Sequence, residues 1–543
     1  MSRAVRRLPC SGTLQPSGGR VPCTCTPDRG APHVTTKSTA TTASKGIGLR
    51  SERGPVLAAI MLCTALVALD STIIATAVPS VVTDLGGFAQ FPWLFSIYLL
   101  TQAVTVPIYG KLADVFGRKP VMFFGIAAFL IGSVLCGVAW SMPALIAFRA
   151  IQGIGAGAVQ PISMTMAGDL YTVEERARVQ GYLASVWGIS AVVGPTLGGV
   201  FAEYVSWRWI FFINLPLGAL ATWMLARRFK EQVKRGSHRI DYTGAALLTG
   251  GSSLLILGLL EGGVAWDWNS APSLLIFAAG LLLIAAFVLV ERRAAEPVLP
   301  LWVFRRRTLT GGNLTSLGIG ALTIGLTSYV PTYAQGVLGT GALVAGFALA
   351  ALTVGWPLAA TFSGRFYMRI GFRDTALIGI VVVVAGTVLC ALLGQNAMIW
   401  QVAAACFVVG VGLGLSASPT MVAVQSVVGW ERRGVVTATN MFCRSLGSTV
   451  GAAVLGAISN ATLSDRFAHP PADVAGRVPD SLDATSLVLK AQGPAAHSAA
   501  ASFVRGALYD AVHHIFVALV VVAVLSVAAL LLMPRRTTEL TFD

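Results

Sequence analysis

The sequence predicts an all-α protein that crosses a membrane many times, and three observations lead to that class. Of its 543 residues, 55% are hydrophobic and only 12% are charged, and the mean hydropathy is +0.73. A soluble protein of this size would carry about 25% charged residues. From Val56 onward the apolar residues fall in runs of about 20, the length that an α-helix needs to cross a bilayer.

The N-terminal segment, residues 1–54, differs from everything that follows. It is rich in Ser, Thr, Pro, Gly and Arg and contains no apolar run. Such a composition buries too little apolar surface to fold, and a signal peptide would need an apolar core. We therefore expect a disordered cytoplasmic tail over 1–54.

Fourteen apolar spans follow the tail. They lie at 56–82, 91–109, 121–140, 142–166, 179–203, 210–226, 242–260, 272–290, 309–333, 341–362, 375–394, 398–422, 435–459 and 511–533. We expect a six-helix bundle over 55–226, two inserted helices with their loops over 227–307, a second six-helix bundle over 308–533 with a long outer loop at 460–510, and a cytoplasmic tail at 534–543. No soluble catalytic domain fits between these spans.

The positions of the basic residues predict the topology. Of the 39 Lys and Arg, 32 fall in segments on the side of the N-terminus, five on the other side and two within spans. Lys and Arg are retained in cytoplasmic loops. Both termini are therefore expected in the cytoplasm, in a multi-pass protein of the cell membrane. The net charge of +15 then faces anionic membrane lipid and indicates no nucleic-acid partner.

A short charged stretch at 110–120 separates the second span from the third. It contains an acid four residues before an arginine, between glycines that permit close backbone approach. A carboxylate among cationic side chains and helix ends can hold one conformer through exchangeable hydrogen bonds. The predicted conformational latch comprises Gly110, Asp114, Gly117, Arg118 and Lys119. A plain charged loop that only sets topology is the alternative.

The stretch 364–373 repeats this pattern in the second half of the chain. Gly364 and Gly371 have the spacing of Gly110 and Gly117, while Met368 stands where the acid does. If the two stretches correspond, the fourteen helices are arranged as six, two and six. Repeated halves of this kind are how many secondary transporters alternate access.

The stretch 110–120 resembles the loop signature of the major facilitator superfamily, and further stretches resemble the fourteen-helix drug:proton antiporter family of multidrug efflux type. These are Leu69–Pro79 for the first helix, Arg149–Gly157 for the fourth, Gly188–Gly199 for the fifth, and Trp207–Pro216 and Tyr333–Gly339. The resemblance implies the major-facilitator fold and an antiporter that exports lipophilic drugs or antibiotic-like molecules. It also implies an export-linked kink motif at Gly194, Pro195, Gly198 and Gly199.

Asp70 is the one carboxylate in the middle of any span. A charge at that depth costs about 2.5–3.5 kcal/mol on insertion scales, so a functional role is expected. We predict that Asp70 exchanges the coupling proton as access alternates, and that Asp70→Asn abolishes proton-coupled efflux. Arg149 joins it through the resemblance of the fourth-helix motif. A structural hydrogen-bonding acid is the alternative for Asp70.

Polar residues at helical spacing mark a candidate substrate cavity. Arg149, Gln152 and Gln160 share one face of their span, because they are separated by three and eight residues. Such a stripe lines a water-filled cavity or binds another helix. The candidate cavity residues are Gln152, Gln160, Trp187, Trp356, Asn440 and Arg444. Two arginines and one acid at mid-span favour neutral, monocationic or anionic lipophilic substrates over dications.

Other functions on the same fold remain open at this point. The alternative is a dedicated exporter of an endogenous metabolite, a lipid or a self-made antibiotic, and a facilitator-type importer would share the fold. A membrane-embedded sensor or enzyme would need a catalytic module, and the sequence offers none. No phosphate-binding Gly-x-x-x-x-Gly-Lys-Ser/Thr motif and no metal-ligand pattern is present. We expect no cofactor, the proton-motive force as energy source, and a functional monomer.

Overall fold

The computed structural model describes Gly48 and residues 51–86, 93–231, 241–262, 266–294, 296–470 and 499–535. In these residues the regular structure is helical, and 14 helices are long and apolar enough to cross a membrane. The predicted all-α, fourteen-span fold class is confirmed. Most of the predicted tail 1–54, residues 471–498 of the predicted outer loop and residues 536–543 lie outside the described residues.

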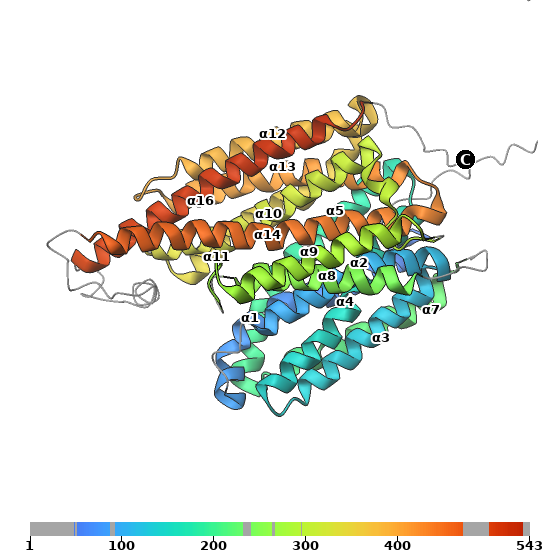
Figure 1. The fold of residues 1–543 in the computed structure, drawn as a ribbon, viewed down its shortest axis with the longest axis horizontal. Coiled ribbons are helices and arrows are strands. Elements are labelled where there is room, and N and C mark those ends of the chain that lie inside the picture. The colour runs from blue at the N-terminus through green and yellow to red at the C-terminus, as the bar shows by residue number, and fades with distance from the viewer. Residues whose placement is uncertain are drawn as a thin grey trace, which may run out of the picture. The chain divides into compact units, whose positions relative to one another are not determined.

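The first bundle contains the helices of residues 54–228 (Figure 1). They are α1 (Gly54–Leu85), α2 (Trp93–Phe116), α3 (Arg118–Gly137), α4 (Met142–Leu170), α5 (Val173–Val200) with a π-helical extension at Phe201–Val205, α6 (Trp209–Phe212) and α7 (Asn214–Arg228). Local signals set the helix starts. Ser141 accepts a hydrogen bond from the backbone of Ala144 before α4, and Thr172 and Glu175 form a capping box before α5.

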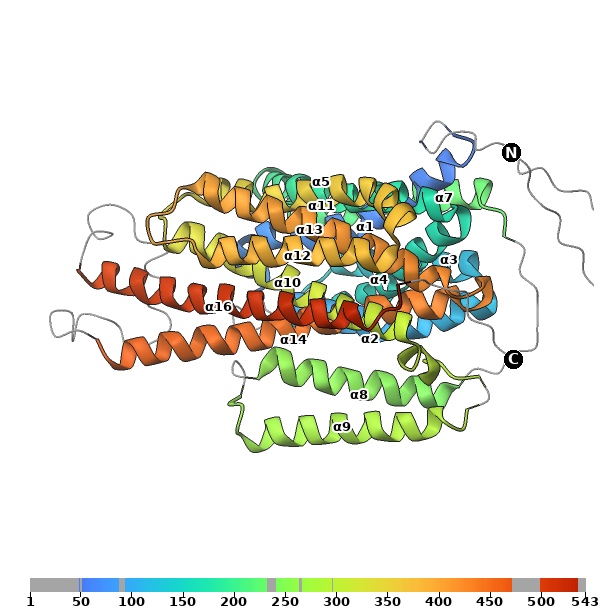
Figure 2. The ribbon, with the colours of Figure 1, turned by 90° about the horizontal axis from the view of Figure 1, so that it is seen from above.

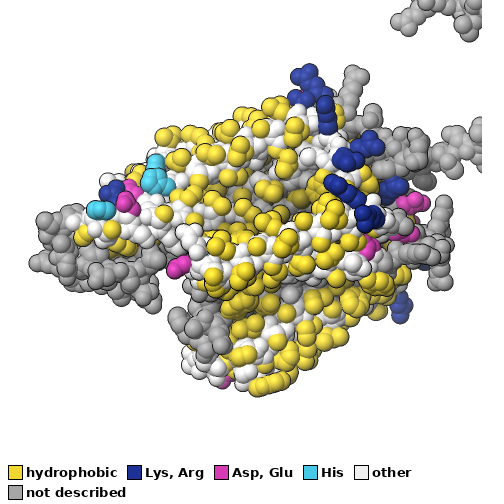
Figure 3. All heavy atoms as spheres, viewed as in Figure 1, with side chains coloured by type: hydrophobic (Ala, Val, Ile, Leu, Met, Phe, Trp, Pro, Cys, Tyr) yellow, Lys and Arg dark blue, Asp and Glu magenta, His cyan; other side chains and the backbone are white. Residues whose placement is uncertain are grey.

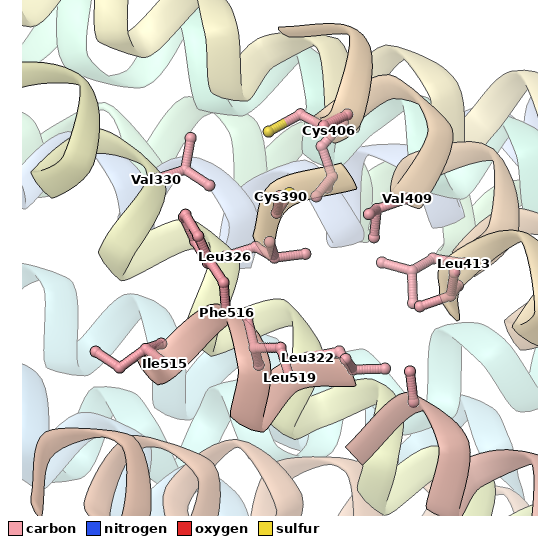
Figure 4. Close-up of a cluster of buried hydrophobic side chains, with 14 of the residues drawn as sticks. Leu322, Leu326, Val330, Cys390, Cys406, Val409, Leu413, Ile515, Phe516 and Leu519 are labelled. Carbon is pink, nitrogen blue, oxygen red and sulfur yellow. The ribbon is translucent and has the colours of Figure 1, made fainter. Parts of the chain in front are cut away.

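The second bundle contains the helices that follow residue 306. They are α10 (Arg307–Gly336), α11 (Ala342–Ile370), α12 (Phe372–Ala391), α13 (Ile399–Ser426), α14 (Arg433–Ala468) and α16 (Ala499–Leu531). Their core is apolar: Leu326 of α10, Val409 of α13 and Phe516 of α16 meet in one buried cluster (Figure 4). Packing of this kind holds the bundle as one unit.

The two inserted helices form a hairpin beside the bundles. They are α8 (Tyr242–Glu261) and α9 (Ala271–Glu291), and α8 packs against α2 and α14 while α9 is outermost (Figure 2). The outer face of α9 exposes Leu275 and Leu282 at 69% and 70%. Leucines this exposed on a membrane-length helix are suited to contact with lipid tails.

Lys and Arg side chains gather at one end of the bundles (Figure 3). This end, called the basic end below, carries the start of α1, the connections α2–α3, α4–α5, α7–α8, α9–α10, α11–α12 and α13–α14, and the end of α16. The distribution agrees with the counts on the sequence.

The charged stretch 110–120 is helix over most of its length and not the loop that the sequence suggested. Helix α2 continues to Phe116 and α3 begins at Arg118, so the turn is the single residue Gly117, with φ +96°. Gly371 repeats this turn between α11 and α12 with φ +93°. Both positions need glycine, because side chains rarely adopt positive φ.

The outer loop is also shorter than predicted. Helix α14 continues nine residues past the predicted span end at 459, to Ala468, and α16 begins at Ala499 and not near 511. In this extended part, Arg466 of α14 forms an ion pair with Asp510 of α16. Residues 460–468 and 499–510 of the predicted loop thus belong to two paired helices.

Candidate functional site

Asp70 lies in the interior of the first bundle, with 1% of its surface exposed. Its two carboxylate oxygens accept hydrogen bonds at 2.6 Å from Arg149 Nη1 and at 2.7 Å from Gln152 Nε2, both on α4. Asn214, the first residue of α7, donates to the same carboxylate at 3.2 Å. The carboxylate is therefore neutralised and bonded by groups from two neighbouring helices.

A second layer of contacts surrounds this pair. Ser133 of α3 accepts hydrogen bonds from Gln152 at 2.8 Å and from Asn214 at 3.2 Å. The Arg149 guanidinium also donates to the carbonyl oxygen of Leu94 and lies 4.1 Å from the ring centroid of Tyr98, both on α2. We call Asp70, Ser133, Arg149, Gln152 and Asn214 the acid cluster. It joins four helices of the bundle, with α2 beside it.

The acid cluster is connected to α5 through a nearby residue of α1. Thr72, two residues after Asp70, donates a hydrogen bond to the carbonyl oxygen of Ser190 at 2.9 Å. A Cβ atom on Gly194 would lie 2.1 Å from the Thr72 hydroxyl, so this glycine permits the contact. The first-helix and fifth-helix motifs therefore touch at the position next to the acid.

The rest of the predicted kink motif has a different environment. Helix α5 runs through Pro195 to Val200, and Gly198 is buried. Around Gly199, however, a Cβ atom would meet nothing within 4 Å. Gly199 therefore has no closely packed neighbour among the described residues, unlike Gly194. Past Val200 the helix widens into the π-helical turn at Phe201–Val205, a common device at functional sites.

A cavity of about 360 Å³ lies between the two bundles. Helices α1, α4 and α5 contribute one wall, with Thr72, Gln160 and Trp187, and α10, α11, α13 and α14 contribute the other. The sequence predicted four more residues for the cavity besides Gln160 and Trp187. Of these, Trp356, Asn440 and Arg444 line this central cavity, and Gln152 does not.

Gln152 belongs to the acid cluster, which corrects its assignment to the cavity. It is fully buried, and its side chain is bonded to Asp70, Ser133 and Arg149. Gln160, eight residues further along α4, accepts a hydrogen bond from Gln102 at 3.0 Å at the cavity wall. The polar stripe on α4 thus serves two separate sites.

At the basic end, Asp114 of α2 joins the two bundles. Its carboxylate oxygens accept hydrogen bonds from the backbone nitrogens of Gly434 and Val435, each at 2.8 Å. These are free N–H groups of the first turn of α14, where the helix dipole also favours a negative charge. The predicted latch acid therefore caps a helix of the other bundle.

Arg118 extends this contact. Its guanidinium forms ion pairs at 3.0 Å with Asp114 and with Asp169 at the end of α4, and donates to the carbonyl oxygen of Trp430 at 2.6 Å. Asp169 is paired in turn with Arg433, which begins α14. The arginine is fully buried although it starts a helix. Acids and arginines thus alternate across the seam between the bundles.

Lys119 lies beside this network but does not cross the seam. Its ammonium group donates to the carbonyl oxygens of Ala226 and Phe229, and its backbone nitrogen donates to Glu231. These partners lie in the last turn of α7 or directly after it, in the first bundle. The predicted latch residue Lys119 therefore ties α3 to the end of α7 and does not contact the second bundle.

Glycines bring the latch helices into contact. A Cβ atom on Gly110 would lie 2.3 Å from the Ala438 Cβ, and one on Gly434 would lie 2.6 Å from the Gly110 oxygen. Gly364 of α11, which corresponds to Gly110 in the repeat, is packed as closely. A Cβ atom on Gly364 would lie 2.7 Å from the Ala177 Cβ of α5. The repeated sequence pattern thus marks two equivalent seams between the bundles.

Several residues of these sites were not assigned from the sequence. Asn214 was quoted within a motif without a role, and Ser133, Asp169, Trp430 and Arg433 were not singled out. In the sequence these residues stand out only as polar or charged positions within or at the end of an apolar span. Many unrelated positions have the same property. No group of three or more His, Cys, Asp or Glu suited to a metal ion occurs in the described parts of the chain.

Two helical bundles that meet at one end around a central cavity, with repeated seams, define the class of a secondary transporter. The family model of the Major Facilitator Superfamily matches residues 60–452. The chain therefore belongs to the Major Facilitator Superfamily, and it is a transporter and not an enzyme.

Curated relatives and a solved structure place it more closely. The chain is 35% identical to "Multidrug resistance protein 3" of Bacillus subtilis (strain 168), over 76% of this chain and 80% of that protein. It is also 35% identical to "Multidrug transporter protein MdtP" of the same organism, over 76% of each chain. The human organic anion transporter MFSD10 has the same fold, with a TM-score of 0.57 and 15% identity over 87% of this chain and 99% of that one.

Proposed function

We propose that this protein is a proton-coupled antiporter that exports lipophilic drugs or antibiotic-like small molecules across the cell membrane. The observation that carries the proposal is the pairing of Asp70 with Arg149 inside the first bundle, two residues along α1 from Thr72 in the cavity wall. The names of the multidrug relatives support the substrate class. In this proposal the protein functions as a monomer embedded in membrane lipid, with the basic end and both termini in the cytoplasm.

The geometry supports indirect coupling between proton and substrate. Asp70 is closed off from the cavity in this conformer, while Thr72, two residues further along α1, lines it. A proton on Asp70 would remove the charge that holds Arg149, so α1 and α4 would lose their strongest contact. Because Thr72 is hydrogen-bonded to α5, a shift of α1 would move the cavity wall. Coupling then needs no direct competition between the proton and the substrate.

The energy source matches this scheme. One proton that crosses about 100 mV releases about 2.3 kcal/mol, which sustains a solute gradient of roughly fiftyfold. In the proposed orientation, the latch at Asp114 closes the cytoplasmic end, so this conformer faces outward. Protonation from outside would then favour the return to the inward-facing conformer.

The test uses purified full-length protein in proteoliposomes with an imposed pH gradient and an internal pH-sensitive dye. Ethidium, tetraphenylphosphonium and anilinonaphthalene sulfonate serve as probes of different charge. The wild type should exchange protons for at least one probe, and Asp70→Asn should lose the exchange. Asp267→Asn is the matched control, because Asp267 is an exposed carboxylate in the α8–α9 connection at the opposite end.

Two results would reject the proposal. The first is probe transport by the wild type that moves no protons, and the second is full coupled transport by Asp70→Asn. Asp70→Glu, which keeps a carboxylate, should retain part of the coupled exchange and thereby separate a lost proton site from a damaged fold.

A further inference from the structure

The central cavity contains a cationic side chain that pairs with no carboxylate among the described residues. Arg444 of α14 lines the cavity and is half-buried, and its guanidinium carbon lies 5.8 Å from the ring centroid of Trp356. It is the one charged side chain among the described lining residues, and no carboxylate lines the cavity with it. The cavity therefore carries a local positive charge.

Two fully buried arginines of this protein are instead paired with acids. Arg149 is paired with Asp70, and Arg118 is paired with Asp114 and Asp169. No ion pair and no hydrogen bond from the Arg444 guanidinium is found among the described residues. A cation at this depth is costly unless an anion or a set of acceptors meets it. Arg444 is thus placed to pair with an anionic ligand in the cavity.

Close packing of α14 against α10 fixes the backbone position of Arg444. A Cβ atom on Gly320 of α10 would lie 2.0 Å from the carbonyl oxygen of Arg444, and one on Gly447 would lie 1.9 Å from that of Leu317. One turn earlier on α14, Asn440 is bonded to Gly312, Asn313 and Ser316 of α10. The backbone that carries Arg444 is thus pre-organised, which reduces the cost of ordering on binding.

The rest of the cavity suits an aromatic or aliphatic body. Trp187 of the first bundle and Trp356 of the second bundle face it, with Leu183, Met164, Ile319 and Met421 among its apolar lining. Indole rings supply large contact area and stack on planar ligands. An apolar wall with one cation is complementary to an apolar molecule with one negative charge.

We propose that the central cavity binds lipophilic organic anions, such as aromatic carboxylates or sulfonates, with Arg444 as the counter-ion. This inference rests on the proposed function and narrows its substrate class. A lipophilic cation would meet Arg444 as a like charge without a compensating acid, because the acid cluster is internally neutralised. A neutral ligand could accept a hydrogen bond from the guanidinium but would not offset its charge. An anion does both, through charge-assisted hydrogen bonds.

The experiment compares three ligands with one aromatic body and different charge: 1-naphthoate, 1-naphthamide and 1-naphthylmethylammonium. Their dissociation constants are measured by equilibrium dialysis on the full chain in detergent, without a pH gradient. The wild type should bind 1-naphthoate at least about tenfold more tightly than the amide, and the ammonium ligand most weakly. Addition of chloride at moderate concentration should weaken 1-naphthoate binding much less than Arg444→Gln does.

The variants test the residue itself. Arg444→Gln should remove the preference for 1-naphthoate over the amide, Arg444→Lys should keep part of it, and Arg444→Glu should reverse it toward the ammonium ligand. Arg369→Gln, in the last turn of α11 at the basic end, is the control and should bind as the wild type does. Melting temperatures verify that each variant is folded, and Arg444→Lys carries the test if Arg444→Gln is unstable.

Three results would overturn the inference: equal affinity for 1-naphthoate and the amide, an unchanged preference in Arg444→Gln, or displacement of 1-naphthoate by chloride alone at low concentration. Failure of the proposed function is distinguishable. If 1-naphthoate binds through Arg444 but drives no proton exchange in proteoliposomes, the proposed anion site is supported and the proposed proton coupling is rejected. If only the ammonium ligand drives proton exchange, the proposed proton coupling is supported and the proposed anion site is rejected.

Discussion

The carboxylate of Asp114 accepts a hydrogen bond from the backbone nitrogen of Gly434 at 2.8 Å, although the two residues are 320 positions apart. This contact attaches the last turns of α2 to the first turn of α14. Since Arg118 and Asp169 continue the network, the basic end is closed by charged groups and not by apolar packing alone. Charged contacts of this kind can open without exposure of a hydrophobic core.

Asp114→Asn should favour opening at the basic end. The amide keeps one acceptor oxygen but loses the charge that pairs with Arg118 and with the start of α14, a loss of about 1–3 kcal/mol. Spin labels at Arg228, the last residue of α7, and at Leu532, directly after α16, report the separation of the bundles. Both residues are exposed. The distance distribution should shift to longer values. An unchanged distribution would show that Asp114 does not stabilise this conformer.

Gly434→Ala should separate α2 from α14. The new Cβ atom would lie 2.5 Å from Asp114 Oδ1 and 2.6 Å from the Gly110 oxygen, both nearer than atoms can approach. We expect the distance between the spin labels to lengthen as in Asp114→Asn, and transport to be slower. Gly456→Ala on the same helix is the matched control, because its Cβ atom would meet only the Tyr329 hydroxyl at 4.0 Å. Equal transport by the two variants would argue against a seam that depends on glycine.

Arg149→Met should destabilise the protein strongly. It leaves the Asp70 carboxylate buried without its ion-pair partner, which costs about 3–5 kcal/mol in comparable pairs. The double variant Asp70→Asn with Arg149→Met removes both charges and should regain much of the melting temperature. It should still not couple protons to transport. A double variant that is no more stable than Arg149→Met alone would mean that the two charges do not stabilise each other.

The pair of Asp84 and Arg208, at the end opposite the basic end, should make stability depend on pH. The hydrogen bond from Arg208 at 2.6 Å lowers the pKa of Asp84, and one from Trp207 at 3.0 Å adds to this. A lowered folded-state pKa stabilises the protein above the unfolded pKa of about 3.9, and the stabilisation disappears as the pH falls through the folded value.

Arg208→Gln should therefore melt at a slightly lower temperature than the wild type at pH 7. The difference should shrink as the pH is lowered toward the folded pKa of Asp84, and also at high salt, since the pair is exposed. Thermal unfolding in detergent at several pH values measures it. A difference that grows on acidification would contradict the assigned sign.

Much of this fold could be predicted from local sequence. The fourteen apolar runs, their order and the basic residues at one end follow from the cost of placing charge in a bilayer, which acts residue by residue. The same cost singled out Asp70, whose burial the structure confirms. The positive φ at Gly117 and Gly371 likewise has a local cause, and the repeat was visible in the spacing.

Only the tertiary structure decided which residues share a site. Arg149 and Gln160 lie on the same face of α4, but they are about 16 Å apart along its axis, so that face meets the acid cluster at one level and the cavity at another. Asp70 and Thr72 are two residues apart and point to different neighbours. Which helix lies opposite a given turn is set by packing between segments far apart in the chain, as Asp114 and Gly434 are. That packing, and not the local pattern, left Arg444 in the cavity without an acid.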